Sequence, residues 1–456
     1  MYKKILIASL ALIAGLASCK KDDPTPSPNP PSTLTIDGVA SSLEFYQLDT
    51  AHLSVAGVAK DAAAKAVWAV NGAKAAEGAT FDFTTAHPGK YEVTLTVDGK
   101  SAKHTYTVAP RFSEGAFLLN EGNFGNETGS LTYIHPSKKL VIDQAYYRVN
   151  GTKLGNVCQD LAFEGGKIYI LSQLGPKNGG EGLLTIANSH SLEKVKVYND
   201  EALAQSTPTH IAVLRDHIYI RTERDGILRG SSEGGFTPIT GTKKALKQRM
   251  AQIGERLFAL TKDNKVLMIQ GTQVVRELDL SPAKPSGIAV SHDGKLWVST
   301  TSPNAILKVD PTPDNFVALD THILDKSISA TGPESWQRTT SSAFFAHGDK
   351  LYFTGQSSVI YCHDFATSKT SQVIDVKTID GVGTSANMYY NSLGVDPATG
   401  ELYYAAFEGY STYNKKNVTM VLKADGTKLL LKEKVNSFPA GFYFIPNAAS
   451  RTGANQ

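Results

Sequence analysis

Aromatic, amide and basic side chains are concentrated in four polar stretches between apolar segments, at residues 120–128, 172–182, 221–226 and 407–417. Aromatic rings give a ligand a large contact area at low entropic cost, while amides and guanidinium groups orient it through hydrogen bonds. We therefore predict a binding surface for a large polar ligand with a flat apolar part, although ordinary solvated turns have a similar composition. The predicted ligand-binding residues of these stretches and of neighbouring segments are Asn120, Glu121, Asn123, Phe124, Gln159, Asp160, Gln173, Arg221, Arg224, Trp336, Arg338, Tyr389, Tyr390, Tyr410 and Tyr413.

Motifs that would indicate catalysis are sparse. Residues 230–234 fit the G-x-S-x-G pattern, but that motif needs a strand–turn–helix elbow and here lies between short strand-like segments. The 11 histidines are scattered, so His210 and His347 are expected to pack or cap within strands rather than bind metal. We expect no enzymatic activity, no cofactor and no metal site. A lactonase or quinoprotein would require clustered carboxylates or a quinone pocket, and only Asp160 is a clear candidate.

The composition is that of a folded protein whose net charge is close to zero. Lys and Arg number 46 against 43 Asp and Glu, which gives no electrostatic basis for binding nucleic acid. The hydrophobic content of 41% is sufficient for a core and excludes a wholly disordered chain. Three cysteines are too few for a disulfide scaffold. We expect Cys158 and Cys362 to be unpaired thiols, with a disulfide between them as the alternative.

The first 19 residues have the organisation of a secretory signal peptide. Lys3 and Lys4 precede an apolar run at residues 5–16 that is too short to cross a bilayer. The sequence Leu-Ala-Ser-Cys at residues 16–19 resembles a bacterial lipobox, which implies cleavage before Cys19 and attachment of lipid to that cysteine. An ordinary signal peptide with a chance cysteine is the alternative.

Residues 20–33 are predicted to form a proline-rich linker, in which polyproline II structure would act as a semi-rigid spacer. The acidic pair Asp22 and Asp23 resembles the surface-export signal of Bacteroidetes lipoproteins. This resemblance implies a protein that is lipid-anchored in the outer membrane and exposed at the cell surface. A linker that is merely solvated is the alternative.

Residues 34–109 are predicted to form a small all-β domain. Tyr91, Val93, Leu95 and Val97 alternate with polar residues, which indicates a strand with one buried face. The pattern W-x-V-N-G, followed by H-P-G-K-Y-E-V-T-L-T-V, resembles an immunoglobulin-like sandwich of the PKD type, in which Trp68 would pack between two sheets. We assign this domain a spacer role, with ligand binding as the alternative.

One sequence phrase recurs six times from residue 160 onward and consists of an apolar segment, a polar turn and an aromatic-rich segment. Equivalent positions are separated by 50, 40, 37, 55 and 50 residues, and each phrase predicts an antiparallel hairpin followed by further strands. A seventh phrase is split between the two ends of residues 111–456, so the last strand would close a ring beside the first. We therefore predict an all-β protein with a seven-bladed β-propeller at residues 111–456. Six or eight blades, or an array of sandwiches, are the alternatives.

The segments F-L-L-N-E-G-N-F-G-N-E-T-G-S, from residue 117, and G-T-K-L-G-N-V-C-Q-D, from residue 151, resemble the YncE-like propellers of Bacteroidetes surface lipoproteins. The resemblance implies capture of cobalamin or another corrinoid on the loop-rich face and its delivery to a TonB-dependent outer-membrane transporter. An adhesion module that binds glycans or proteins, without a role in transport, is the alternative.

Overall fold

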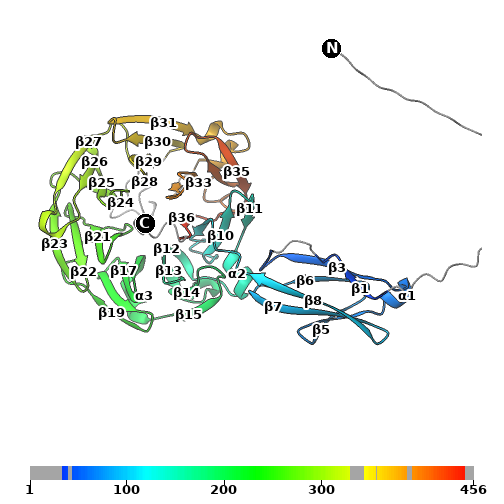
Figure 1. Ribbon diagram of the computed structural model, residues 1–456. Coiled ribbons are helices and arrows are strands. Elements are labelled where there is room, and N and C mark those ends of the chain that lie inside the picture. The colour runs from blue at the N-terminus through cyan, green and yellow to red at the C-terminus, as the bar shows by residue number, and fades with distance from the viewer. Residues whose placement is uncertain (1–32, 40–43, 329–343, 356, 388–392, 447–456) are drawn as a thin grey trace, which may run out of the picture. The chain divides into compact units, whose positions relative to one another are not determined.

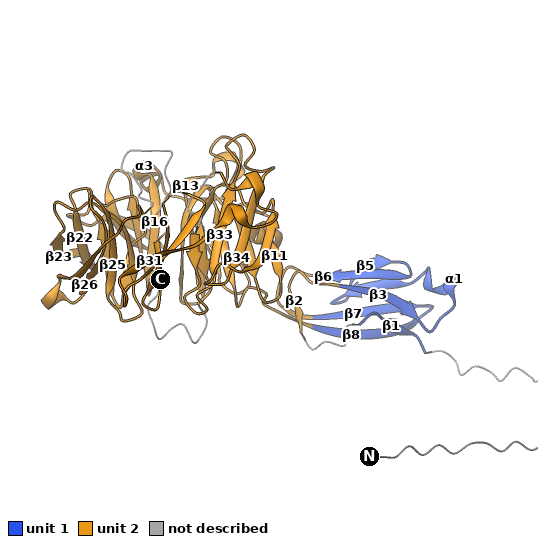
Figure 2. Cartoon of the chain, turned by 90° about the horizontal axis from the view of Figure 1, so that it is seen from above, with its two compact units in different colours: residues 1–41, 51–83, 91–106 blue, residues 42–50, 84–90, 107–456 orange. Residues whose placement is uncertain are grey.

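The computed structural model describes residues 33–39, 44–328, 344–355, 357–387 and 393–446, and these residues form an all-β protein. The chain divides into two compact units, shown in different colours in Figure 2. The smaller unit comprises residues 1–41, 51–83 and 91–106, and the larger one comprises residues 42–50, 84–90 and 107–456. This division assigns residues 42–50 and 84–90 to the larger unit, whereas the interval 34–109 predicted from the sequence includes them in the small domain.

The first eight strands form two sheets, one of three strands and one of five. Trp68 is fully buried, its ring lies 5.6 Å from that of Phe81, and its indole N–H donates to the carbonyl of Gly78 at 2.9 Å. One short helix, α1 (Lys60–Ala63), accompanies these strands. The three-stranded sheet has the order β1 (Thr35–Asp37), β3 (Thr50–Ala56) and β6 (Thr80–Thr84), and the five-stranded sheet has the order β2 (Phe45–Tyr46), β8 (Lys100–Ala109), β7 (Gly89–Val97), β4 (Val67–Val70) and β5 (Ala73–Glu77).

The remaining strands of the described chain form seven four-stranded antiparallel sheets, which are arranged around a ring (Figure 1). A radial array of this kind is a β-propeller. From the centre of the ring outwards, sheet 1 consists of β36 (Pro439–Phe444), β9 (Ala116–Asn120), β10 (Ser130–His135) and β11 (Leu140–Ile142), and sheet 2 of β12 (Asn156–Glu164), β13 (Lys167–Gly175), β14 (Leu184–Asn188) and β15 (Lys194–Tyr198). In the same order, sheet 3 consists of β16 (Pro208–Leu214), β17 (His217–Thr222), β18 (Gly226–Ser231) and β19 (Gly234–Pro238); sheet 4 of β20 (Ala251–Ile253), β21 (Arg256–Leu260), β22 (Lys265–Gln270) and β23 (Gln273–Asp279); and sheet 5 of β24 (Pro285–Val290), β25 (Leu296–Thr301), β26 (Asn304–Val309) and β27 (Ala318–Ile323). Sheet 6 consists of β28 (Phe344–His347), β29 (Lys350–Thr354), β30 (Val359–Asp364) and β31 (Lys369–Asp375), and sheet 7 of β32 (Leu393–Val395), β33 (Leu402–Phe407), β34 (Asn417–Leu422) and β35 (Lys428–Glu433).

The helices of the larger unit are short and lie between strands. α3 begins after Asp200, whose carboxylate accepts the N–H of Leu203 at 2.7 Å and so caps the first turn. In the described residues none of the helices combines the length and the apolar character that crossing a lipid bilayer requires. The helices are α2 (Ala145–Asn150), α3 (Glu201–Ser206) and four 3-10 turns, η1 (Lys177–Gly179), η2 (Pro313–Asn315), η3 (Val376–Thr378) and η4 (Gly383–Ser385).

The six hairpins predicted from the repeated phrase are confirmed, because the first two strands of sheets 2 to 7 pair antiparallel. The pairing predicted for the two ends of the propeller is confirmed as well. β36 pairs antiparallel with β9, so that Tyr443 lies opposite Phe117 and Phe442 opposite Leu118. Segments more than 300 residues apart in the sequence thus complete sheet 1.

The two faces of an inner strand such as β9 contact two different neighbouring sheets, which explains why both faces are apolar. Alternate residues of a strand point to opposite sides of a sheet. In β9, Phe117 and Leu119 belong to the core cluster that includes Leu161 and Ile168 of sheet 2, while Ala116 and Leu118 belong to the cluster with Tyr403 of sheet 7. The inner strand β9 is therefore buried between sheets 2 and 7, whereas outer strands such as β27 are exposed to solvent.

Candidate ligand-binding face

A β-bulge at the start of the innermost strand recurs in sheets 1, 2, 3 and 5. The bulge falls between Cys158 and Asp160 in sheet 2 and at the corresponding position of the other three sheets. Because a bulge adds one residue to one strand, it changes which side chain points towards the centre of the ring. The residues that the bulges leave outside the ladder are Gln159, Thr209, Ser286 and Ala440.

Five segments of sheets 1, 2 and 7 meet at this end of the ring, and we call their surface the loop face. It consists of residues 120–128, 156–159, 172–182, 407–417 and 436–438. The N–H of Glu121 donates to the carbonyl of Phe438 at 2.8 Å, and the Asn178 amide donates to the carbonyl of Phe124 at 3.3 Å. The structure thus brings together Asn120, Glu121, Asn123, Phe124, Gln159, Tyr410 and Tyr413, all of which were predicted as ligand-binding residues.

Glycine at position 122 allows the loop after β9 to close. Its φ is 74°, in the left-handed region, and a Cβ atom there would lie 2.2 Å from the carbonyl oxygen of Thr128. The Asn156 side-chain amide fastens the same loop from sheet 2 by donating to the carbonyls of Asn123 and Glu127. The N-E-G-N sequence therefore has a structural reason as well as a predicted binding role.

Four aromatic rings pack together on the loop face, and we call Phe407, Tyr410, Tyr413 and Phe438 the aromatic cluster. Phe438 is its centre, with ring centroids 5.1 Å from Phe407, 5.8 Å from Tyr410 and 4.5 Å from Tyr413. Phe407 is fully buried, whereas Tyr410 is 47% exposed and lies stacked on Phe438. The cluster thus offers one accessible aromatic surface on a packed base. Its central residue, Phe438, was missed from the sequence because it comes from a segment distant from the tyrosines.

Both tyrosine hydroxyls of the aromatic cluster stay protonated at neutral pH. Burial and then the nearby charge of Glu121 raise the pKa of Tyr410. Burial, the charge of Glu127 and a hydrogen bond to that carboxylate raise the pKa of Tyr413. The two hydroxyls therefore remain hydrogen-bond donors under physiological conditions.

Several predicted site residues use their polar groups within the fold. Asn120 donates to the hydroxyls of Ser130 and Thr132 and accepts the N–H of Ser437 at 3.0 Å. Gln159 donates to the carboxylate of Glu121 at 2.9 Å. These side chains are almost fully buried, so their contribution to a site is to hold the loops in place.

Asp160 lies within a buried polar group that joins four sheets. Its carboxylate accepts the hydroxyl of Tyr443 at 2.6 Å and the N–H of Ile211 at 2.9 Å, and it pairs with the guanidinium of Arg249 at 3.2 Å. Arg249 also lies 4.2 Å from the centre of the Tyr443 ring. Burial raises the pKa of Asp160, and the charge of Arg249 opposes the rise. Arg249 was not predicted, because nothing in its local sequence indicates that it reaches sheets 1 and 2.

Three further predicted residues belong to sheets 2 and 3. Gln173 lies in β13 of sheet 2, Arg221 in β17 of sheet 3, and Arg224 in the turn that follows β17. Arg221 is 2% exposed and donates to the carbonyl of Ala245 and the hydroxyl of Thr209, which makes it an internal brace. Burial lowers its pKa, and the carboxylate of Glu223 opposes that effect. Arg224 is exposed in the turn between β17 and β18, and Gln173 is half-buried in β13.

Four predicted ligand-binding residues, Trp336, Arg338, Tyr389 and Tyr390, lie outside the described residues, as does the predicted lipidation site Cys19. Cys158 and Cys362 are both buried and form no disulfide with each other. Within the described ranges, no three His, Cys, Asp or Glu side chains are grouped so that they could hold a metal ion.

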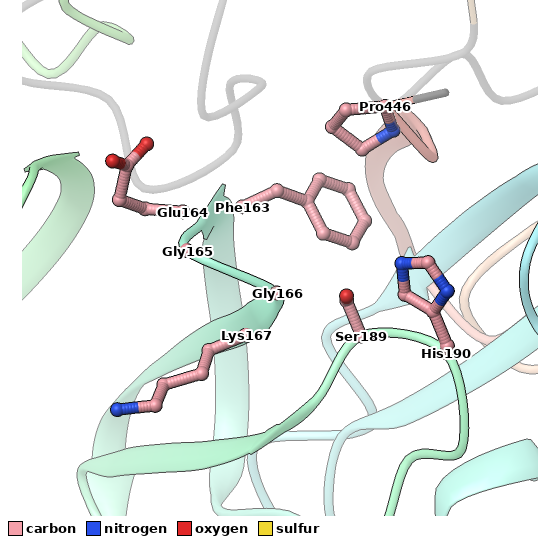
Figure 3. A pocket seen from close by; sticks show the side chains of 8 residues that line it. All are labelled: Phe163, Glu164, Gly165, Gly166, Lys167, Ser189, His190 and Pro446. Carbon is pink, nitrogen blue, oxygen red and sulfur yellow. The ribbon is translucent and has the colours of Figure 1, made fainter. Parts of the chain in front are cut away.

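A pocket of about 320 Å³ lies at the opposite end of β12 from Gln159. Figure 3 shows the Phe163 ring, Ser189, His190 and Pro446 around it, while the charged ends of Glu164 and Lys167 point away. None of the predicted ligand-binding residues lines this pocket. The loop face and the pocket are therefore separate features of the larger unit.

The architecture and the loop-borne candidate site define a protein of the β-propeller class. A family model described as a domain of unknown function (DUF5074) matches residues 114–446, and the chain belongs to this family. No curated protein matches the chain.

Solved structures share the fold at low sequence identity. A quinonprotein alcohol dehydrogenase-like protein from Bacteroides thetaiotaomicron aligns over 92% of this chain and 97% of its own, with 15% identity and a TM-score of 0.59. A functionally unknown protein from Desulfotomaculum acetoxidans aligns over 72% of this chain and 98% of its own, with 13% identity and a TM-score of 0.45. At 15% identity the first likeness concerns the fold alone.

Proposed function

We propose that this protein binds a ligand on the loop face without transforming it, and that the ligand is cobalamin or another corrinoid. The observation that carries the proposal is the aromatic cluster, in which Tyr410 is 47% exposed and lies stacked on Phe438. Exposed aromatic rings on a packed base provide the kind of contact that dominates binding energy at interfaces. Phe124 is a second exposed ring on the loop face, 63% exposed, with the Lys177 ammonium 3.5 Å from its ring centre.

The rigidity of the loop face supports a role in binding. The loop after β9 is fixed by main-chain hydrogen bonds to residues 437 and 438 and by the amide of Asn156. A site that is ordered before the ligand arrives avoids part of the entropic cost of association. A flat, apolar macrocycle with polar substituents would match the exposed rings and the surrounding donors.

The proposal extends to the whole protein. We propose that Cys19 carries a lipid that anchors the protein to the outer membrane at the cell surface, and that the ligand passes to a TonB-dependent transporter. We also propose that the seven described sheets are the complete set of blades and that residues 34–109 form an immunoglobulin-like spacer. The pairing of β36 with β9 and the burial of Trp68 support these last two points.

Isothermal titration calorimetry of the full chain in detergent, with cyanocobalamin, tests the proposed function. We expect binding at micromolar concentration or tighter. Tyr410→Ala should weaken binding about 30-fold, which corresponds to roughly 2 kcal/mol at an interface hot spot. Leu319→Ala is the matched control, because Leu319 is 48% exposed in β27, the outer strand of sheet 5, which does not contribute to the loop face, and it should leave the affinity unchanged. No heat and no co-elution with the wild-type protein would contradict the corrinoid and favour the adhesion alternative.

A further inference from the structure

The pocket beside the turn between β12 and β13 is a second feature of the larger unit that could hold a ligand. Its volume of about 320 Å³ falls at the lower end of the range for small-molecule sites, roughly 300–1,000 Å³. Its described walls come from residues 163–167 and 189–190 of sheet 2 and from Pro446, which follows β36 of sheet 1. All of these residues belong to the larger unit, so the pocket is formed by the propeller itself.

The Ser189 hydroxyl lines this pocket without a partner in the fold. Ser189 is only 4% exposed, and its hydroxyl makes no hydrogen bond within the described part of the chain. Its main-chain N–H donates to the carbonyl of Gly166 at 3.0 Å, which fixes the residue in place. In Figure 3 the hydroxyl points into the space between the rings of Phe163 and His190. A ligand that pairs with this hydroxyl would recover a hydrogen bond that the fold leaves unmade.

His190 supplies a second polar group beside Ser189. Its main chain is held at both ends, because its N–H donates to Oδ1 of Asn188 at 2.8 Å and its carbonyl accepts the N–H of Phe112 at 2.9 Å. Its partly exposed imidazole makes no hydrogen bond to the residues that the structure describes. An imidazole ring and a hydroxyl can each donate and accept, so the two side chains suit a partner that also does both.

The apolar wall of the pocket is supported from behind. The Phe163 ring lies 6.3 Å from the ring of the fully buried Phe117, at an interplanar angle of 27°. At Gly165 and Gly166 an added Cβ atom would meet no other atom within 4 Å, so the space beside this turn is open. The charged ends of Glu164 and Lys167 point away (Figure 3). The pocket therefore combines a fixed aromatic ring with two neutral polar groups and has no charged group directed into it from its described walls.

We propose that this pocket binds a neutral sugar unit. A pyranose ring has an apolar face of C–H groups, which suits the Phe163 ring, and a rim of hydroxyls, each of which donates and accepts. That rim matches Ser189 and His190. A charged ligand would lose hydration here without gaining an opposite charge, which disfavours it. The site is separate from the loop face and does not depend on the proposed binding of a corrinoid.

Saturation-transfer difference NMR of the full chain in detergent tests the proposal. The probes are the methyl α-glycosides of glucose, galactose, mannose and fucose. We expect at least one to bind with a dissociation constant on the order of 1 mM, as is typical of so small a ligand. Ser189→Ala should weaken that binding about fivefold, the effect of one net hydrogen bond. His190→Ala should have a similar effect and serves as the second variant if Ser189→Ala lowers the melting temperature.

Two further variants locate the binding. Ser232→Ala is the matched control, because Ser232 lies in the turn between β18 and β19 of sheet 3, outside the pocket, and should leave the affinity unchanged. Tyr410→Ala should also leave it unchanged, since Tyr410 belongs to the loop face. Failure of all four glycosides to bind at about 10 mM would overturn the inference, as would affinities that stay unchanged in both pocket variants. Loss of binding in Tyr410→Ala would overturn it too, because the sugar would then occupy the loop face.

Discussion

At the residue scale, the ion pair between Asp160 and Arg249 lies where sheets 1, 2, 3 and 4 meet. Asp160→Asn should lower the free energy of unfolding by about 3 kcal/mol, because Asp160 is almost fully buried and its carboxylate holds Tyr443, Ile211 and the partly exposed Arg249 together. Urea unfolding followed by circular dichroism measures the change. Asp263→Asn removes the exposed pair with Lys244 and should cost about 1 kcal/mol or less. Similar losses in the two variants would contradict a special role for the buried pair.

Asp293 gives a prediction about acid stability at the same scale. Burial alone would raise its pKa, but hydrogen bonds from Lys308, Ser291 and the N–H of Lys295 outweigh burial and lower the pKa to about 2. Because the folded pKa lies below the unfolded value of about 3.9, the stabilisation is complete above pH 4 and is lost as the pH falls towards 2. Asp293→Asn should therefore flatten the dependence of the unfolding free energy on pH between about 4 and 2. An unchanged acid slope in this variant would count against the prediction.

At the scale of elements, β36 is the strand that joins the two ends of the propeller. Deleting residues 438–456 would leave β9 paired on one side only, with β10, and would remove Phe442, which is 2% exposed and packs on Tyr403. Loss of one buried phenylalanine costs about 3–5 kcal/mol, so the cooperative transition of the propeller should shift to much lower temperature or disappear. Differential scanning calorimetry measures this directly. A truncated protein that melts like the wild type would contradict closure by β36.

At the scale of the whole molecule, the position of the protein in the cell depends on Cys19. Cys19→Ala should move the protein from the membrane fraction to the soluble fraction or stall its processing, because the attached lipid is the proposed anchor. Immunoblotting of fractionated cells measures the distribution. Cys362→Ala is the control, since that thiol is buried in sheet 6 and should not affect membrane attachment. Full retention of the Cys19 variant in the outer membrane would contradict lipid anchoring at this residue.

The amino-acid sequence was sufficient to predict the strands, the hairpins and the order of the sheets, because these depend on local patterns. Turn sequences such as Asp293-Gly294 and the alternation of apolar residues act over a few positions and recur in each repeat. The pairing of the last strand with the first could be predicted because its two halves match one phrase.

The tertiary structure alone decided which predicted residues are accessible and which are internal. Asn120 accepts the N–H of Ser437, 317 positions away, and Asp160 accepts the hydroxyl of Tyr443, 283 positions away. Arg249 and Phe438 have their roles only because closure of the ring brings other sheets to them. One extra residue in a bulge, as at Gln159, changes the direction of a side chain without any local sequence signal. Contacts of this kind depend on the packing of distant strands, and no pattern within a single segment specifies them.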